Sequence, residues 1–187
     1  MKVASTKLIP LHIPKRLNNQ HKVFKGIAAR GKGSTGWSFG FKLHVVVSDS
    51  GELLAIYLTA VNRHELKALP KLVKRLFGKL FADMAYLSQP LFEQLMDQGI
   101  QLITKLKSNM KNKLMVMTDK LLLRKRSIIE TINDQLKNIS QIEHSRHRSP
   151  VNFLVNLVSG LVAYTHQPKK PSLDFAQFPR LENLVYP

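Results

Sequence analysis

The sequence predicts an α/β domain built on a mixed central sheet, and three observations support this fold class. Residues 39–47 and 52–59 are β-rich runs on either side of a glycine-containing turn, Ser-Asp-Ser-Gly, which indicates an antiparallel hairpin. Farther along, short strand-like runs at 80–82 and 100–104 alternate with helical patterns, as in α/β sheets. An apolar content of 44% in 187 residues favours one folded domain with a real core over a disordered chain.

The first forty residues predict a strand and then an irregular basic segment. Residues 3–9 form a β-compatible run, and we expect Pro10 to end it. Residues 21–40 hold five glycines among five basic side chains. Gly31, Gly33 and Gly36 spell a GxGxxG pattern, but a dinucleotide site needs that pattern between a strand and a helix, whereas Trp37 begins an alternating strand. The segment is therefore interpreted either as a loop that approaches a phosphate or as a long surface turn.

The rest of the chain predicts helices between the later strands. The expected helices are 64–77, ended by Gly78, then 89–98, ended by Gly99, then 121–139, and finally an apolar core helix at 151–165. Residues 105–120 are polar and rich in methionine, so we expect a mobile loop there. The tail from residue 167 contains Pro168, Pro171 and Pro179, and we expect it to be loose or to lie along the surface. We therefore expect one domain over residues 1–166 and a proline-containing tail over 167–187.

The charge of the chain predicts a polyanionic partner. The formal net charge is +17, and residues 1–48 contain nine Lys or Arg and no acid. Such a field favours nucleic acid, with binding that weakens steeply as the salt concentration rises. The sign of the charge alone is equally compatible with a membrane surface or ribosomal RNA.

The composition also restricts where the protein works. The chain has no cysteine, which excludes disulfides and thiolate metal sites. It shows no secretory signal pattern at its N-terminus and no run of eighteen apolar residues. We therefore expect a cytoplasmic protein with no membrane partner.

The helix expected at 121–139 carries an acid in an unusual setting. Its apolar stripe consists of Ile129, Ile132, Leu136 and Ile139, at steps of three and four. A second face aligns four charged side chains at the same kind of spacing: Arg126, Glu130, Asp134 and Lys137. On this helix alone, the simplest interpretation is a solvated face with weak ion pairs of about 0.3–0.5 kcal/mol each.

A second acid upstream changes that interpretation. Together with Asp83, the spacing Arg126-x3-Glu130-x6-Lys137 resembles the catalytic domain of bacterial insertion-sequence transposases of the DDE class. Those proteins carry a Tyr-x2-Arg-x3-Glu-x6-Lys signature, and Leu123 stands here in place of its tyrosine. Tyr86 follows Asp83 at the spacing typical of the family, with Ala85 where a glycine is usual. The resemblance covers about residues 3–171 and implies the RNase H-like fold, with three leading strands before alternating helices and strands.

The resemblance also implies a chemistry. It assigns Asp83 as the second catalytic acid and Glu130 as the third, both ligands of two Mg2+ or Mn2+ ions about 3.5–4 Å apart. Carboxylates suit this task because they are hard oxygen ligands. Arg126 and Lys137 would orient Glu130 or contact phosphate. The expected partners are the ends of an insertion sequence and its target DNA, bound by a possible homo-oligomer. Three more phosphate contacts are expected from the basic N-terminal third: Lys25, Arg30 and Lys32.

The first acid of the family is missing. Relatives carry it in an Asp-Ser-Thr-like triplet on the first strand, and this chain reads Ala4-Ser5-Thr6. Because Ala4 cannot bind a cation, we expect weakened metal binding and very slow or absent strand cleavage. The chain starts only three residues before this position and so looks like the C-terminal piece of a transposase. The alternative function is a basic module that binds nucleic acid without catalysis.

Overall fold

The computed structural model describes residues 3–13, 22–33, 36–105, 119–120, 122–123, 127–143 and 147–172. Six strands form one sheet: β1 (Val3–His12), β2 (Ala29–Gly33), β3 (Gly36–Ser48), β4 (Leu53–Ala60), β5 (Gly78–Ala82) and β6 (Ile100–Thr104). Four α-helices accompany them: α1 (Glu65–Leu72), α2 (Gln89–Asp97), α4 (Ser127–Asn138) and α5 (Pro150–Thr165). Two short 3-10 turns are also present: η2 (Lys22–Phe24) and η3 (Met84–Tyr86).

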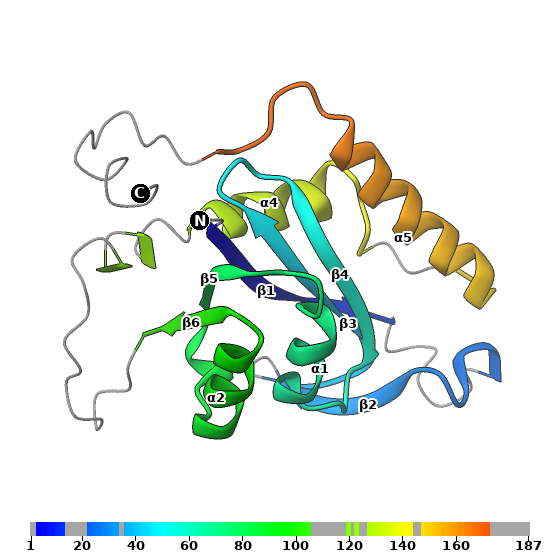
Figure 1. Cartoon of the computed structure of the whole chain (residues 1–187). Helices are drawn as coiled ribbons and strands as arrows, with labels where there is room; N and C mark the ends of the chain where they lie inside the picture. The colour runs from blue at the N-terminus through cyan, green and yellow to red at the C-terminus, as the bar shows by residue number, and fades with distance from the viewer. Residues whose placement is uncertain are drawn as a thin grey trace.

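The sheet is mixed, as predicted (Figure 1). Its central strand β1 runs antiparallel to β3 and parallel to β5, and β6 continues the parallel part beside β5. On its other edge, β3 pairs with β2 over 36–40 and with β4 over 41–47. The hairpin predicted around the Ser-Asp-Ser-Gly turn is thus β3–β4, and the order agrees with the RNase H-like arrangement.

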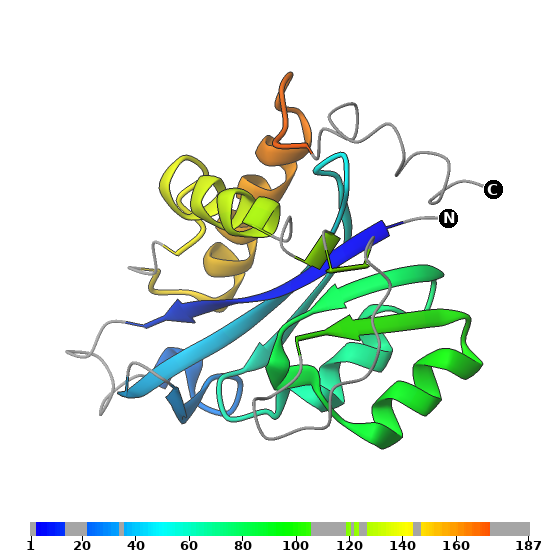
Figure 2. The same ribbon diagram turned by 90° about the vertical axis from the view of Figure 1, so that its left-hand side faces the viewer.

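Helices cover both faces of the sheet. Figures 1 and 2 show α1 and α2 on one face and α4 and α5 on the other. Side chains alternate along β1, so Ile9 and Leu11 pack against α4 and α5, whereas Ala4 packs against α1 and α2. Each face therefore has its own apolar cluster. No helix among the described residues is both long and apolar enough to cross a membrane.

Strand β1 is longer than predicted, because Pro10 does not end it. The strand runs to His12, and Pro10 pairs with Lys42 of β3. Strand β5 accompanies β1 only at residues 3–5, so no strand of the described residues pairs with the other edge of β1 at Pro10. A proline, which lacks an N–H group, is tolerated in a strand where no neighbouring strand needs that donor.

The glycine-rich segment is also more ordered than predicted. Residues 29–33 form β2, which pairs with the start of β3 in a second hairpin. Gly40 lies where β1, β2 and β3 meet, with φ +149°, and a Cβ there would stand 2.2 Å from the Leu11 carbonyl oxygen. Because glycine has no Cβ, three strands can approach one another at this point. Gly31, Gly33 and Gly36 lie in this hairpin, in agreement with the rejection of a dinucleotide site.

The helices lie where the sequence predicted them, but their lengths differ from the prediction. Helix α1 ends at Leu72, five residues earlier than expected, and contains Pro70. Helix α5 packs one face into the core, as predicted, and its other face is exposed. Five large apolar side chains on that face are 46–65% exposed: Val151, Leu154, Val155, Val158 and Val162. Most of the loop expected at 105–120 and the end of the tail lie outside the described residues, and the division at residue 166 stays a prediction.

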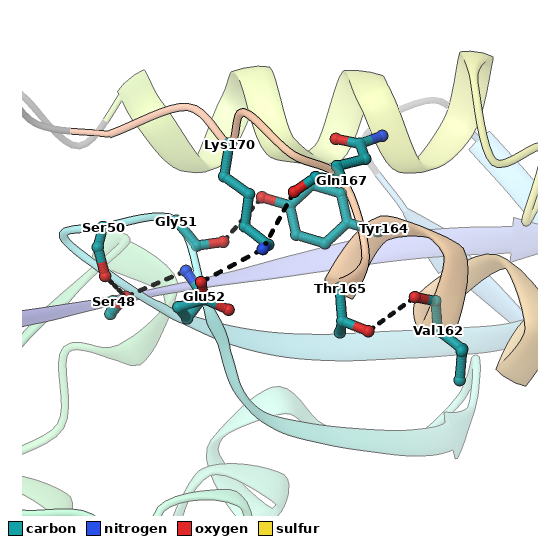
Figure 3. Close-up of polar contacts among 9 residues, drawn as sticks. All are labelled: Ser48, Ser50, Gly51, Glu52, Val162, Tyr164, Thr165, Gln167 and Lys170. Atoms are coloured by element: carbon teal, nitrogen blue, oxygen red, sulfur yellow. Dashed lines mark hydrogen bonds and ion pairs between the residues drawn. The ribbon is translucent and has the colours of Figure 1, made fainter.

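The end of α5 attaches to the turn of the β3–β4 hairpin (Figure 3). The hydroxyl group of Tyr164, which is fully buried, donates a 2.8 Å hydrogen bond to the Gly51 carbonyl oxygen. Just beyond the helix, Lys170 forms an ion pair with Glu52 at 3.3 Å. Burial, with a further contribution from the Glu52 carboxylate, raises the pKa of Tyr164 to about 12. The contacts fix α5 to a turn more than a hundred residues earlier in the chain.

Candidate functional site

Asp83 stands at the carboxyl end of β5. The strand is buried from Leu80 to Ala82, and the chain then turns out to solvent, where Asp83 is exposed. Its carboxylate accepts a 2.8 Å hydrogen bond from the Met84 N–H group and begins η3. The carboxyl ends of parallel strands are the usual place for ligands in α/β sheets. The position fits a functional acid, although an N-terminal cap would also favour aspartate.

Tyr86 lies near two carboxylates, those of Asp83 and Glu65. Tyr86 at the end of η3 is 2% exposed. Burial raises its pKa, and the charges of Glu65 and Asp83 raise it further, while the Thr6 hydroxyl opposes them. The Tyr86 and Thr6 hydroxyls lie near each other, but within the described residues neither has a hydrogen bond of good geometry. Glu65 begins α1, so the start of α1 lies close to η3 and Asp83.

Glu130 projects from the exposed side of α4. The buried side of this helix carries Ile129, Ile132 and Leu136 of the predicted apolar stripe, whereas Ile139 follows the end of the helix and is 66% exposed. Glu130 lies in the first turn of the helix, where the helix dipole favours a negative charge. Its placement is therefore compatible with both the catalytic role and the simpler structural role. The assignment of Asp83 and Glu130 to one centre stays a prediction.

A short segment before α4 ties this part of the chain to β5. Asp119 is 5% exposed and pairs with Lys79 of β5 at 2.5 Å. Phe81, two residues after Lys79 in β5, packs with Leu122 and Leu123, which follow Asp119. The segment thus advances along β5 toward the end that carries Asp83. The sequence alone did not reveal this ion pair, because its partners are forty residues apart and no local pattern links them.

Ala4 does not face the layer that carries Glu130. Its side chain is 8% exposed and packs in the cluster of α1 and α2 with Leu80, its partner in β5. Helix α4 covers the opposite face of the sheet. An acid at position 4 would therefore enter an apolar cluster with Leu69 and Leu72 of α1. Whether Ala4 marks the place of a lost catalytic acid stays a prediction.

The described residues do not fit a complete metal site. Among them, no group of three or more His, Asp or Glu side chains is close enough to hold a metal ion. Two-metal sites require several hard oxygen ligands, and Asp83 with Glu130 would supply at most two side chains. Within the described ranges, these two acids are therefore too few to make a two-ion centre.

The predicted DNA-binding residues are not all gathered in one place. Lys137 forms an ion pair with Glu143 at 3.1 Å, and Arg126 lies outside the described residues. Lys25, Arg30 and Lys32 are exposed around β2. Strand β2 begins to pair at the level of His12 in β1, whereas Phe81 of β5 pairs with Ser5. Asp83 follows Phe81 by two residues in this parallel pair, near the level of Lys7, so about 17 Å of extended strand separate it from the level of His12.

A buried histidine that the sequence did not single out lies on the α1 side of the sheet. His44 is 1% exposed, and its Nε2 atom shares a 2.9 Å hydrogen bond with the Thr59 hydroxyl. Its Nδ1 atom has no hydrogen-bond partner in the described part of the chain. Burial lowers the pKa of His44 to about 4, and the nearby Lys42 charge contributes. The histidine is therefore neutral at pH 7.

Comparison with known proteins identifies a family. A family model described as "Transposase DDE domain" matches residues 2–150, which is most of the chain. A search of curated proteins finds no match. The matched region includes β1 to β6, Asp83 and the whole of α4 with Glu130.

Proposed function

Because this chain belongs to the transposase DDE domain family, we propose that it binds DNA and engages the phosphodiester backbone beside Asp83, with Glu130 as the second acid. The family supports a transposase function, and DNA is the partner that this function implies. Members of the family generally use divalent metal ions. We further propose that strand cleavage by this chain is very slow or absent.

The observation that carries the proposal is the position of Asp83. The acid is exposed at the carboxyl end of a parallel strand within the matched region. The segment from Asp119 to Leu123 lies along the same strand and leads into the helix with Glu130. Both features favour an approach of the two acids. The net charge of +17 would draw DNA to the surface around them.

The proposed loss of cleavage follows from the ligand count. Position 4, which the family resemblance assigns to the first acid, holds an alanine in an apolar cluster. With that carboxylate absent, two acids contribute a charge of −2 against +4 for two divalent ions. Cation binding should weaken accordingly, because hard cations depend on anionic oxygen ligands.

The test is a nicking assay with the terminal DNA of the insertion sequence and either Mg2+ or Mn2+. We expect no cleavage by the wild-type chain above the level of an Asp83→Asn variant, whereas both should bind the DNA. Clear nicking by the wild-type chain that Asp83→Asn abolishes would disprove the proposed impairment.

An Ala4→Asp variant addresses the cause of the impairment. Recovery of cleavage would show that the rest of the catalytic centre is intact. Thermal unfolding must accompany this assay, because a carboxylate placed among Leu69 and Leu80 is costly to bury. A variant that folds and binds DNA like the wild type but still fails to cleave would refute the assignment of Ala4.

A second candidate function is DNA binding without catalysis. The absence of a three-ligand metal cluster among the described residues favours it. The two functions predict the same salt-sensitive binding but differ after Ala4→Asp, because only a former catalytic centre can regain cleavage.

A further inference from the structure

Helix α1 and the turn after it expose a row of cations that we define as the α1 ridge: Arg63, Lys67, Lys71, Lys74 and Arg75. Lys67 and Lys71 are four residues apart within α1, so the helix aligns them on one side, and Lys74 and Arg75 follow in the turn after the helix. The opposite side packs on the sheet through Ala68, Leu69 and Leu72. The cations are thus turned toward solvent by the same helix geometry that buries the leucines.

No acid within the described residues neutralises the ridge. Glu65 is the one acid between residues 63 and 75, and it pairs instead with Lys42 at 3.4 Å. None of the five cations forms an ion pair with another described side chain. Five like charges on one short surface repel one another, which favours a bound polyanion.

Stability of the helix does not explain the ridge. Cations near the end of a helix are favoured by its dipole, which accounts for Lys71 and the two residues that follow the helix. Arg63 and Lys67 lie at the start of α1, where the dipole disfavours positive charge. Folding alone would thus select against these two cations, whereas a phosphate backbone would favour them.

The start of the ridge lies next to the candidate site, whereas its end leads toward Gly78, at the amino end of β5. Helix α1 packs against η3, which begins immediately after Asp83. Besides burial, the negative charges of Glu65, at the start of α1, and of Asp83 both help to raise the pKa of Tyr86. A duplex whose backbone reaches Asp83 can therefore continue over α1. Lys67 and Lys71 are about 6 Å apart along the helix axis. Two successive phosphate-to-phosphate steps of one DNA strand cover a similar length, about 7 Å, along the duplex axis.

We propose that the α1 ridge is a DNA-backbone binding surface that holds the duplex beside Asp83. The proposal deepens the proposed function, on which it rests for its choice of DNA. The ridge should bind phosphates without reading the base sequence, because the lysines act as mobile point charges. The ridge begins close to β2, because a Cβ at Gly31 would stand 2.6 Å from the Val61 side chain and Arg63 follows Val61 by two residues.

The experiment compares two pairs of substitutions in the full chain. One variant carries Lys67→Gln and Lys71→Gln, and its matched control carries Arg148→Gln and Lys169→Gln at exposed positions before and after α5. Each pair removes two positive charges. Glutamine has nearly the helix propensity of lysine, so α1 should still form. Circular dichroism and thermal unfolding verify that both variants fold.

The measurement is the affinity for a duplex of arbitrary sequence over a series of salt concentrations, by fluorescence anisotropy. Loss of two phosphate contacts should lower the slope of log K against log salt by about 1.8, with affinity on the order of 10-fold or more weaker at 0.1 M salt. The control pair should leave the slope of the wild type nearly unchanged. Equal effects of both pairs would show that only net charge matters and would overturn the proposal.

The same data separate this proposal from the proposed function. If the wild type binds the duplex with a steep salt dependence but the ridge variant keeps the wild-type slope, the ridge is refuted and DNA binding stands. If the wild type fails to bind at low salt, both proposals are refuted. Cleavage is not needed for either conclusion.

Discussion

Helices α1 and α5 lie on opposite faces of the sheet and present contrasting outer surfaces. Each packs one apolar side against strands (Figures 1 and 2). Outward, α1 shows the cations of its ridge, whereas the sixteen residues of α5 include no charged side chain. Packing on a sheet determines only the inner side of a helix. The outer sides therefore carry information about partners, and only that of α1 is suited to DNA.

The interiors beneath the two helices differ as well. The core under α5 includes three mutually packed rings, Phe24, Phe41 and Phe153, with centroids 5.1–6.1 Å apart. On the α1 side, buried polar groups of His44 and Thr6 interrupt the apolar cluster. The α5 side should depend mainly on packing, and the α1 side should respond to pH.

The largest expected effect tests packing under α5. Phe153→Ala should lower the free energy of unfolding by about 3–5 kcal/mol, because it removes a buried ring and leaves a cavity. Val155→Ala, on the exposed side of the same helix, should cost no more than about 0.5 kcal/mol. Urea denaturation measures both. A large cost at Val155 would mean that the outer side of α5 is buried in solution, for example in the oligomer that remains a prediction.

A smaller effect tests the α1 side through His44. Its pKa is about 4 in the folded chain and near 6.5 when unfolded. Well above pH 6.5 the imidazole is neutral in both the folded and the unfolded chain, and its titration does not lower the free energy of unfolding. Below pH 6.5 the unfolded chain binds a proton first, so stability falls and levels off near pH 4, by at most about 3 kcal/mol.

Urea midpoints at several pH values measure this loss in the wild type and in His44→Gln, which cannot titrate at this position. We expect a flatter profile for the variant between pH 6.5 and 4. Parallel profiles would show that other groups, and not the buried imidazole, govern acid stability on this side.

The smallest expected effect tests the attachment of α5 to the hairpin turn. Tyr164→Phe removes the hydrogen bond to the Gly51 carbonyl oxygen (Figure 3) and should cost about 1 kcal/mol. In a chain of this size, that corresponds to a decrease in Tm of about 2–4 °C. An unchanged Tm would indicate that water replaces the hydroxyl at no cost.

The elements that the sequence predicted well have strong local signals. The β3–β4 hairpin follows from two β-rich runs around a glycine-containing turn, and α4 follows from its stripe of isoleucines. Pro10 and the glycine-rich segment misled the prediction for a common reason. Whether a proline or a glycine is compatible with a strand depends on the neighbouring strands, and the local sequence does not specify them.

The candidate site shows the same division. By itself, the sequence indicated the family, through Asp83, Glu130 and the spacing around them, because residue types and their spacing can be read from a single chain. Only the tertiary structure decided that Ala4 faces α1, that Asp119 meets Lys79 and that the start of the α1 ridge lies beside Asp83. Those relations join residues far apart in the sequence, and they arise from strand register and from the face that each helix buries.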